Sequence, residues 1–334
     1  MTVESLCATA RDARSLRLGM LDEFRRRVRF DAFAWLLTDP VTTVGTSPIA
    51  DVPCLPELPK LIRLKYATPV NRWTTQPTPV ATLDAAAGGQ LDRSLVWRDL
   101  LVDHGVTDIA SVVFRDRGNC WAFLDLWRIG GVFSDSETRT LEQWVPVVTD
   151  ALRRCVAATF AEDRADRPTD RADPVVLLLT VDLDVRAQTQ ATERYLRTLV
   201  PPDDSRPPVP AAAYNVGAQL LAVERGVDDH RPMARIHLTG GDWVTLRAAR
   251  IEEGIAVTIE ASTSAERLDL FCRSANLSVR ETELVELLAT GADTASVAQD
   301  MFVSPHTVQD HLKSIFAKTG ASSRRELLAR IGRH

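Results

Sequence analysis

The stretch that most constrains the fold is residues 304–320, SPHTVQDHLKSIFAKTG, because it carries helix signals at both ends. Ser304 is a favoured N-cap residue, Pro305 follows where a missing N–H costs nothing, and Gly320 suits the left-handed conformation that ends many helices. The stretch therefore predicts one amphipathic helix with a polar face that could lie in a groove. Its apolar residues recur at i, i+4, i+7 and i+8: Val308, Leu312, Ile315 and Phe316.

Further helical patterns surround this helix. Ser278 and Glu281 form a capping-box pattern that opens the first of them, and Ser323 and Glu326 repeat the pattern near the chain end. Residues 294–301 predict a short helix that ends just before the capped one, which is typical of a helix-turn-helix corner. We expect four short helices around one small core.

In this order, LSVRETELVELLATG and VAQDMFVSPHTVQDHLKSIFAKTGASSRRELL resemble the C-terminal DNA-binding domain of the LuxR/FixJ family of bacterial transcription regulators. The resemblance covers residues 277–331, and the run S-P-x-T-V-x-x-H-x-x-x-I-x-x-K is specific for that family. It implies that the third helix enters the major groove and reads base edges there, while cap and loop residues hold phosphates. A sigma-factor C-terminal domain is disfavoured, because no core-binding helices precede this segment.

Carried onto this chain, the resemblance implies eight positions at the DNA interface. The expected base-facing residues are Gln309, Asp310 and Lys313. The expected phosphate or framework residues are Ser304, Thr307, His311 and Lys318, with Arg324 at the start of the last helix.

Two positions and the charge distribution depart from a simple DNA-binding pattern. The family usually has Lys or Arg after the Thr-Val pair, where this chain has Gln309, followed by Asp310. Gln can read adenine and Asp can accept from cytosine, but an acid near DNA also repels phosphate. Residues 304–334 carry a net charge of +4 and residues 277–303 a net charge of −4. We therefore expect altered specificity and modest phosphate affinity that depends on dimer formation.

Length and composition set limits on the remaining chain. With 334 residues and 45% apolar residues, it can hold two or three domains with sizeable cores. No apolar run approaches the roughly 18 residues of a membrane span, and residues 1–20 lack the apolar region of a signal peptide, so we expect a cytoplasmic protein without membrane contact. Its five scattered cysteines, without a C-x-x-C pair, indicate buried reduced thiols instead of a disulfide framework or zinc site.

Residues 1–160 predict a mixed α and β domain. A helix at 10–28 precedes a strand marked by Phe33, Trp35 and Leu37. Two strands, 109–115 and 120–127, flank a hairpin signal. Further helices are expected at 57–65, at 92–103 and, with a kink at Pro146, from a Ser134 or Ser136 cap to residue 160. This order resembles a GAF sensor domain. Six of the seven tryptophans lie here and favour plain core over a ligand cavity.

Residues 161–173 predict a charged linker, and residues 174–261 a second mixed domain. A strand at 175–181 is followed by helices at 189–199 and 211–224 around a proline-rich loop at 201–210. Three strands then follow at 234–238, 243–248 and 255–260, with a Gly240-Gly241 turn. The order resembles a PAS sensor domain. A lone His237 on a strand indicates a structural or exposed residue more than a metal or haem ligand. Residues 262–276 then predict a connecting helix.

The expected fold class is multidomain α+β, with GAF-like and PAS-like domains ahead of an all-α four-helix LuxR-type domain at 277–334. No phosphate loop, dinucleotide fingerprint, zinc-protease motif or serine-nucleophile motif occurs, so we expect no enzyme, cofactor or metal site. The predicted function is a transcriptional regulator that binds double-stranded promoter DNA as a homodimer controlled by its sensor domains. The alternative is a signalling adaptor with weak or lost DNA binding. The effector, the target genes, the direction of regulation and the dimerising segment stay open.

Overall fold

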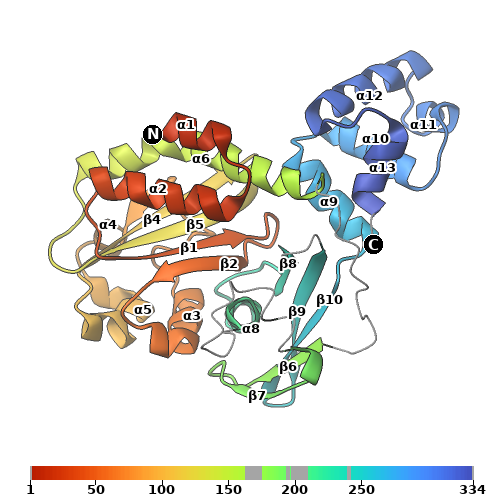
Figure 1. Ribbon diagram of the computed structural model, residues 1–334. Helices are drawn as coiled ribbons and strands as arrows, with labels where there is room; N and C mark the ends of the chain where they lie inside the picture. Colours follow the sequence, from red (N-terminus) through yellow and green to blue (C-terminus); the bar gives the residue numbers. More distant parts are fainter. Residues whose placement is uncertain (1, 162–174, 193–195, 197–209, 239–241, 333–334) are drawn as a thin grey trace.

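The computed structural model describes residues 2–161, 175–192, 196, 210–238 and 242–332. Within these ranges the chain forms two five-stranded antiparallel sheets, followed by a group of helices at the C-terminus (Figure 1). This agrees with the expected α+β class and its all-α end. No helix among the described residues has the length and apolar character needed to cross a membrane.

The first sheet has the strand order β2-β1-β5-β4-β3. The predicted hairpin joins β4 to β5 through Arg117 and Gly118, whose φ angles of 43° and 81° are the positive values that a tight two-residue hairpin turn requires. Strand β2 was not anticipated from the sequence. The strands are β1 Ala32–Thr38, β2 Gly45–Asp51, β3 Val80–Thr82, β4 Asp108–Asp116 and β5 Asn119–Arg128.

Helices cover both faces of this sheet. On one face lie α1 Val3–Thr9, α2 Ala13–Arg27 and α6 Asp135–Thr159. Helix α6 begins at a capping box of Ser134 and Glu137 and continues through Pro146. The predicted helix at 92–103 is instead a short α-helix between two 3-10 turns. The second face carries α3 Leu58–Ala67, α4 Leu83–Ala87 and α5 Leu95–Asp99, with the 3-10 turns η1 Leu55–Glu57, η2 Leu91–Arg93 and η3 Leu101–His104.

The second sheet has the order β7-β6-β10-β9-β8. In both sheets the second strand along the chain lies at one edge, followed by the first, the fifth, the fourth and the third. The strands of the second sheet are β6 Val175–Leu179, β7 Val185–Gln188, β8 Met233–His237, β9 Trp243–Ile251 and β10 Gly254–Ala261. Strands β8, β9 and β10 lie where the sequence predicts strands, whereas β7 was not predicted. Four predicted segments lie mostly or wholly outside the described residues: the linker at 161–173, the helix at 189–199, the loop at 201–210 and the Gly240-Gly241 turn.

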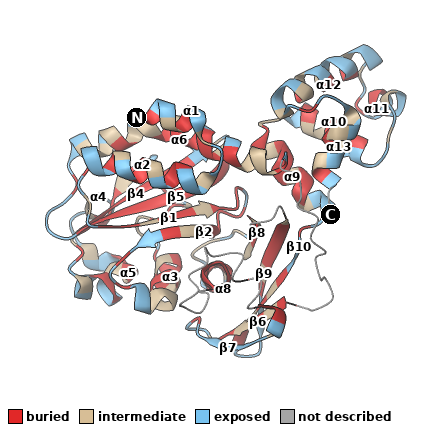
Figure 2. Ribbon diagram, viewed as in Figure 1, coloured by how far each residue is buried: buried red, intermediate tan, exposed pale blue. Residues whose placement is uncertain are grey.

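Helix α8 Ala211–Glu224 joins the two sheets into one N-terminal body, which we define as the described residues from 2 to 261. The helix is buried along most of its length (Figure 2). A Cβ on Gly217 would lie 3.1 Å from the Leu183 side chain, so glycine lets the helix approach the second sheet closely. Tyr66 and Trp73 from the first sheet's side share one apolar cluster with Ile255 of the second. The two sheets therefore share part of one hydrophobic core.

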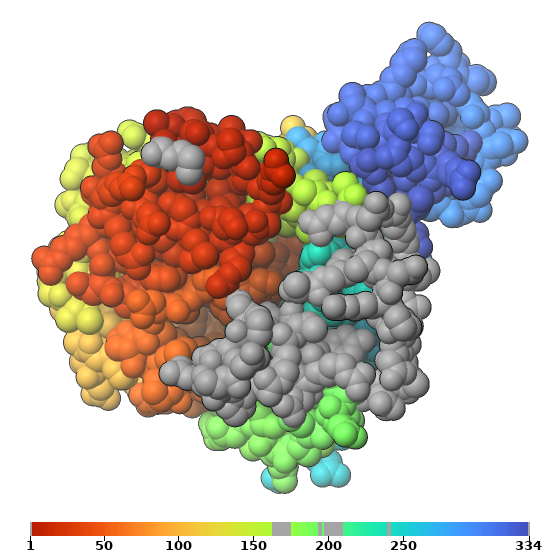
Figure 3. Space-filling view, in the orientation of Figure 1, coloured from red at the N-terminus to blue at the C-terminus, as the bar shows by residue number. Residues whose placement is uncertain are grey.

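The C-terminal helices form a lobe that projects from the N-terminal body (Figures 1 and 3). They are α9 Ser264–Ser274, α10 Val279–Ala289, α11 Thr294–Asp300, α12 Pro305–Thr319 and α13 Arg324–Gly332. Helix α9 corresponds to the predicted connecting helix. Its Phe271 packs against Phe160 at the end of α6, and Phe160 in turn stacks on Trp243 of β9. On its other side, Arg267 Nε donates to the Ile331 carbonyl of α13 at 3.0 Å.

Candidate nucleic-acid interface

Helix α12 begins and ends where its sequence signals predict. Ser304 Oγ accepts a hydrogen bond from the Thr307 N–H at 3.1 Å and lies 2.9 Å from Thr307 Oγ1. At the other end Gly320 has φ 68°, and its N–H donates to the Phe316 carbonyl. The start of α12 therefore places two hydroxyl groups beside a helix N-terminus, a position that favours phosphate.

The apolar stripe of α12 packs on the other helices of the lobe. Val308, Leu312 and Ile315 are buried, and Phe316 is half-buried. The opposite side of α12 is exposed (Figure 2). The residues that support the stripe from α10, α11 and α13 are Leu284, Val285, Leu288, Val297, Ala298, Leu327 and Ile331. This packing holds the polar side of α12 outward, as the sequence predicted.

Three polar side chains lie close together on the exposed side of α12. Lys313 Nζ donates to Asp310 Oδ1 at 3.1 Å, and His306 Nε2 lies 3.6 Å from Asp310 Oδ2. The hydrogen bond from Lys313 and the nearby His306 lower the pKa of Asp310. Gln309 beside them is exposed. The base-facing positions predicted from the sequence thus lie on one surface, where Asp310 offsets part of the positive charge.

Lys318, although also exposed, is bound to a buried carboxylate of another helix. Its Nζ donates to both carboxylate oxygens of the buried Glu281, at 2.9 and 2.6 Å, and Ser314 Oγ donates to the same carboxylate at 2.6 Å. Burial would raise the pKa of Glu281, but the hydrogen bonds from Lys318, Ser278 and Ser314 outweigh it and hold the pKa at about 2. Lys318 therefore joins α12 to α10, which corresponds to the framework alternative of its predicted role.

The remaining predicted positions lie around the same lobe. Arg324 donates from its guanidinium to the Ala292 carbonyl, in the connection between α10 and α11. His311 is half-buried on α12. The predicted capping box before α13 forms only in part, because the Glu326 carboxylate accepts from the N–H of Ser322 and not from that of Ser323.

One exposed aromatic side chain of the lobe was not identified from the sequence. Phe302 lies in the turn between α11 and α12, has φ 56°, and is 95% exposed. The sequence signal that could have indicated its exposure is an apolar residue in the short turn between two predicted helices. This exposed ring lies three residues before α12 in the chain.

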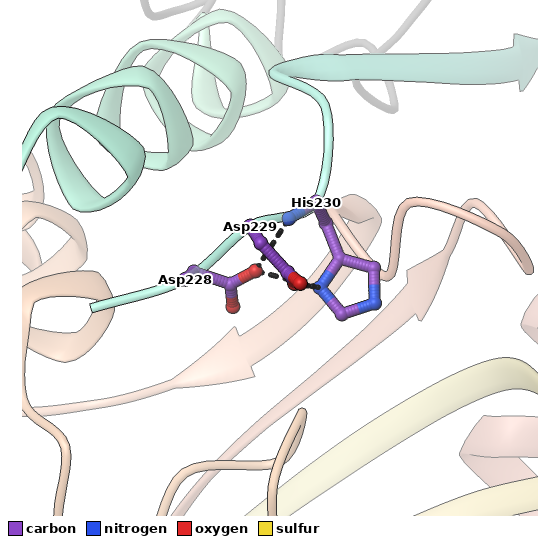
Figure 4. Close-up of side chains that lie close together, drawn as sticks. All are labelled: Asp228, Asp229 and His230. Carbon is purple, nitrogen blue, oxygen red and sulfur yellow. Dashed lines mark hydrogen bonds and ion pairs between the residues drawn. The ribbon is translucent and has the colours of Figure 1, made fainter. Parts of the chain in front are cut away.

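Outside the lobe, one group of side chains among the described residues has the spacing of a metal site (Figure 4). It consists of Asp228, Asp229 and His230. Asp228 Oδ1 accepts from the N–H and lies 2.6 Å from Nδ1 of His230, while Asp228 Oδ2 accepts from Arg72 at 2.6 Å. The hydrogen bond that His230 makes to the Asp228 carboxylate raises the pKa of His230. Protein donors thus occupy both oxygens of Asp228, and the group is an ion-pair network.

His237, the residue weighed as a metal or haem ligand, belongs to no such group among the described residues. Its ring centre lies 5.3 Å from that of Trp243. Burial, and secondarily the charge of Arg267, lowers the pKa of His237 from 6.5 to about 4. The imidazole is therefore uncharged at neutral pH. Its packing against Trp243 indicates a structural role.

Comparison with known proteins identifies the C-terminal lobe. Residues 275–330 match the model of the family described as bacterial regulatory proteins, luxR family. HTH-type transcriptional regulators of Mycobacterium bovis and Mycobacterium tuberculosis are 38% identical to this chain over 58 residues. That match covers 17% of this chain and only 7% of each mycobacterial protein.

Two solved structures have weaker similarity. The crystal structure of Escherichia coli SdiA has a TM-score of 0.36 and 11% identity, covering 97% of this chain and 91% of SdiA. The complex of Vibrio cholerae VqmA with ligand and DNA has a TM-score of 0.21 and 20% identity, covering 48% of this chain and 81% of VqmA. Scores this low do not establish a shared fold.

Proposed function

We propose, from the LuxR-family helix-turn-helix domain at residues 275–330, that this chain is a transcriptional regulator that binds promoter DNA. The observation that carries the proposal is the exposed side of α12, held outward by its buried apolar stripe. An exposed helix of this kind, capped and supported by a tight helix-turn-helix corner, can enter the major groove. The match to regulatory proteins agrees with the prediction that the chain is not an enzyme.

The proposed contacts follow from the positions of the side chains. Gln309, Asp310 and Lys313 would face base edges, because they are exposed on one side of α12. The hydroxyls of Ser304 and Thr307 would approach a phosphate at the N-terminus of α12. The remaining proposed interface positions, in contact with the backbone or in support of the lobe, are His311, Lys318 and Arg324.

The N-terminal body is proposed to be the regulatory part. We propose a GAF-like domain at 1–160 and a PAS-like domain at 174–261, joined by the linker at 161–173. The common strand order of the two sheets supports a common type of domain. Pairing of two chains would present two copies of α12 to half-sites about one helical turn apart, and a change in this pairing would change DNA affinity.

Selection from genomic DNA tests this function. The full-length protein is incubated with fragmented genomic DNA at low salt, and the bound sequences are recovered and compared. We expect a common motif with two-fold symmetry, and an observed binding constant that falls linearly with salt on logarithmic axes. Bound fragments without any common motif, or no binding at low salt, would contradict the proposal and favour the adaptor alternative.

A further inference from the structure

A cavity of about 430 Å³ lies where the two sheets of the N-terminal body meet α9. Its wall takes residues from α2, β1 and β2 on one side, from β8 and β9 on the other, and from α6 and α9. This volume is in the range of small-molecule binding sites, which often lie at domain interfaces. The cavity is remote from the exposed side of α12 and is not used by the DNA-binding proposal.

Arg17 places a buried positive charge at this cavity. The side chain is 3% exposed, and its guanidinium donates to the carbonyls of Ala13, Trp35 and Ser47 at 2.7 to 3.0 Å. No described carboxylate forms an ion pair with it. Burial, and then the charge of Arg14, lowers the pKa of Arg17 to about 9. A buried cation held by neutral carbonyls alone is costly, and an anion beside it would offset that cost.

The other charges of the wall leave an excess of positive charge. Arg11 and Arg14 are exposed at the rim and form no ion pair with a described residue. Asp12, the acidic wall residue within the part of the chain that the structure describes, accepts from the Ser15 N–H at 2.8 Å as the cap of α2. Arg235 is neutralised separately, by Asp39 at 2.6 Å and by Asp269 of α9 at 2.7 Å.

The opposite wall is largely apolar and contains a buried donor without a partner. Trp243 is 7% exposed, and its Nε1 has no hydrogen-bond partner among the described residues. The same holds for Nε2 of the neighbouring His237. Leu270 of α9 and Trp121 of β5 add further apolar surface to the wall. Buried polar atoms normally have partners, so two unpaired nitrogens in one cavity wall indicate a place for a ligand atom or ordered water.

We propose that this cavity binds a small organic anion, with its carboxylate or phosphate group beside Arg14 and Arg17 and its apolar body against Trp243 and Leu270. The buried guanidinium supplies a charge-assisted hydrogen bond to the anionic group. The rim arginines raise the local concentration of anions. The aromatic wall accommodates the uncharged part of the molecule.

The occupied cavity is also connected to the C-terminal lobe. Leu270 of α9 forms part of the wall, and Arg235 in the wall pairs with Asp269 of the same helix. One turn earlier on α9, Arg267 bonds the Ile331 carbonyl of α13. A ligand that shifts α9 therefore acts on the attachment of the DNA-binding lobe. This second part rests on the proposed DNA-binding function, whereas the binding of the anion does not.

Calorimetric titration of the full-length protein tests the first part. The probes are benzoate, indole-3-acetate and inorganic phosphate. Benzamide is the neutral control for benzoate, and indole-3-acetamide is the neutral control for indole-3-acetate. We expect at least one of these anions to bind at one site per chain. An organic anion should bind at least tenfold more tightly than its neutral counterpart. Phosphate, which has no such counterpart, should saturate the site below millimolar concentration. Arg14→Gln and Arg17→Met should each weaken that binding at least tenfold. Arg27→Gln, an exposed change on the same helix away from the cavity, should leave it unchanged.

The outcomes separate the two parts. If no anion binds in this way, or if Arg14→Gln leaves binding unchanged, the site assignment is wrong. Arg14→Gln removes no described contact and so decides the question even if Arg17→Met fails to fold. DNA affinity is then measured by fluorescence anisotropy with and without the bound anion. A change of threefold or more that Arg14→Gln abolishes supports the coupling, and an unchanged DNA affinity refutes it. Absence of all DNA binding would refute the proposed function and leave the anion site standing.

Discussion

Asp310 is the residue that most distinguishes the exposed side of α12. Its carboxylate lies at hydrogen-bond distance from Lys313 and within 3.6 Å of His306, so positive charge that could meet DNA is partly offset within the helix itself. Exposed ion pairs of this kind contribute little to stability, typically below about 1 kcal/mol. In the proposed DNA complex we expect a larger effect on affinity, because phosphate and Asp310 repel each other and compete for the same lysine.

Substitutions at these two positions should change DNA binding in opposite directions. Lys313→Ala should weaken binding to the selected DNA by about 1 to 3 kcal/mol if the side chain reads a base, or reduce the salt slope by about one if it contacts phosphate. Asp310→Asn should strengthen binding to non-selected DNA. Anisotropy titrations over a salt series measure both. Lys60→Ala, at an exposed ion pair of the N-terminal body, is the control. DNA binding unaffected by Lys313→Ala would mean that another surface reads the DNA.

His237 should make the N-terminal body sensitive to acid. Its pKa falls from 6.5 to about 4 on folding, because burial and then Arg267 disfavour the imidazolium, while Asp242 opposes this shift. The unfolded chain therefore binds more protons between these values, so the stabilising contribution is complete above pH 6.5 and is lost as the pH falls towards 4.

Urea denaturation at pH 7 and pH 4.5 measures this effect. One pKa unit corresponds to about 1.4 kcal/mol, so His237 should account for a loss of up to roughly 2 to 3 kcal/mol over this interval. His237→Phe, which cannot be protonated, should lose less stability on acidification than the unchanged protein. An equal loss in the two proteins would show that other groups cause the acid sensitivity.

Among the helices, the joint between α10 and α12 depends on one buried carboxylate. Glu281 closes the cap of α10 through the Ser278 N–H and also accepts from Ser314 and Lys318 of α12. The capping box predicted from the sequence is therefore also a contact between two helices. Glu281 makes the one ion pair between these two helices among the described residues, in addition to the apolar packing that orients α12.

Lys318→Met should destabilise the lobe by about 1 to 3 kcal/mol, because it removes two hydrogen bonds and the cation from the buried Glu281 carboxylate. The double variant Glu281→Gln with Lys318→Met should be less destabilised than Lys318→Met alone. Thermal unfolding of the full-length proteins, followed by circular dichroism, measures both. If Lys318→Met keeps its melting temperature but loses DNA affinity, Lys318 is a phosphate contact and not a framework residue.

For the whole molecule, the two sheets and the connecting helix meet at buried ion pairs. The Arg235 and Asp39 side chains are 4% and 0% exposed and join the second sheet to the loop after β1. Arg72, between α3 and β3, and Asp228, between α8 and β8, make a second buried pair, 1% and 2% exposed. Together with the shared apolar cluster around α8, these contacts make the N-terminal body one packed unit.

Removal of one member of the first pair should destabilise that unit as a whole. Asp39→Ala leaves Arg235 buried without its main partner, and we expect a loss of about 3 to 5 kcal/mol in the free energy of unfolding. Asp51→Asn, an exposed change on the neighbouring strand, is the matched control and should have little effect. Denaturant unfolding should show one transition for both sheets. Two separate transitions, with only one shifted by Asp39→Ala, would show that the sheets fold independently.

The sequence by itself determined the features that depend on neighbours a few residues apart. The caps and stripe of α12, the capping box of α10 and the β4–β5 turn follow from local hydrogen bonds and from periodic burial, so their residues predict them directly. The expected interface on α12 therefore came from the chain alone. The core role predicted for the tryptophans also holds for Trp35 and Trp73, which are buried.

Only the tertiary structure decided which distant segments meet. Edge strands β2 and β7 carry weak patterns, because pairing with a neighbour, not their own periodicity, holds them in place. The pairing of Asp39 with Arg235 joins residues 196 positions apart, and the contact of Lys318 with Glu281 joins residues 37 apart. The cavity beside Arg17 exists only where both sheets, α6 and α9 come together. No local pattern encodes such contacts, because they arise when separate apolar surfaces exclude water against each other.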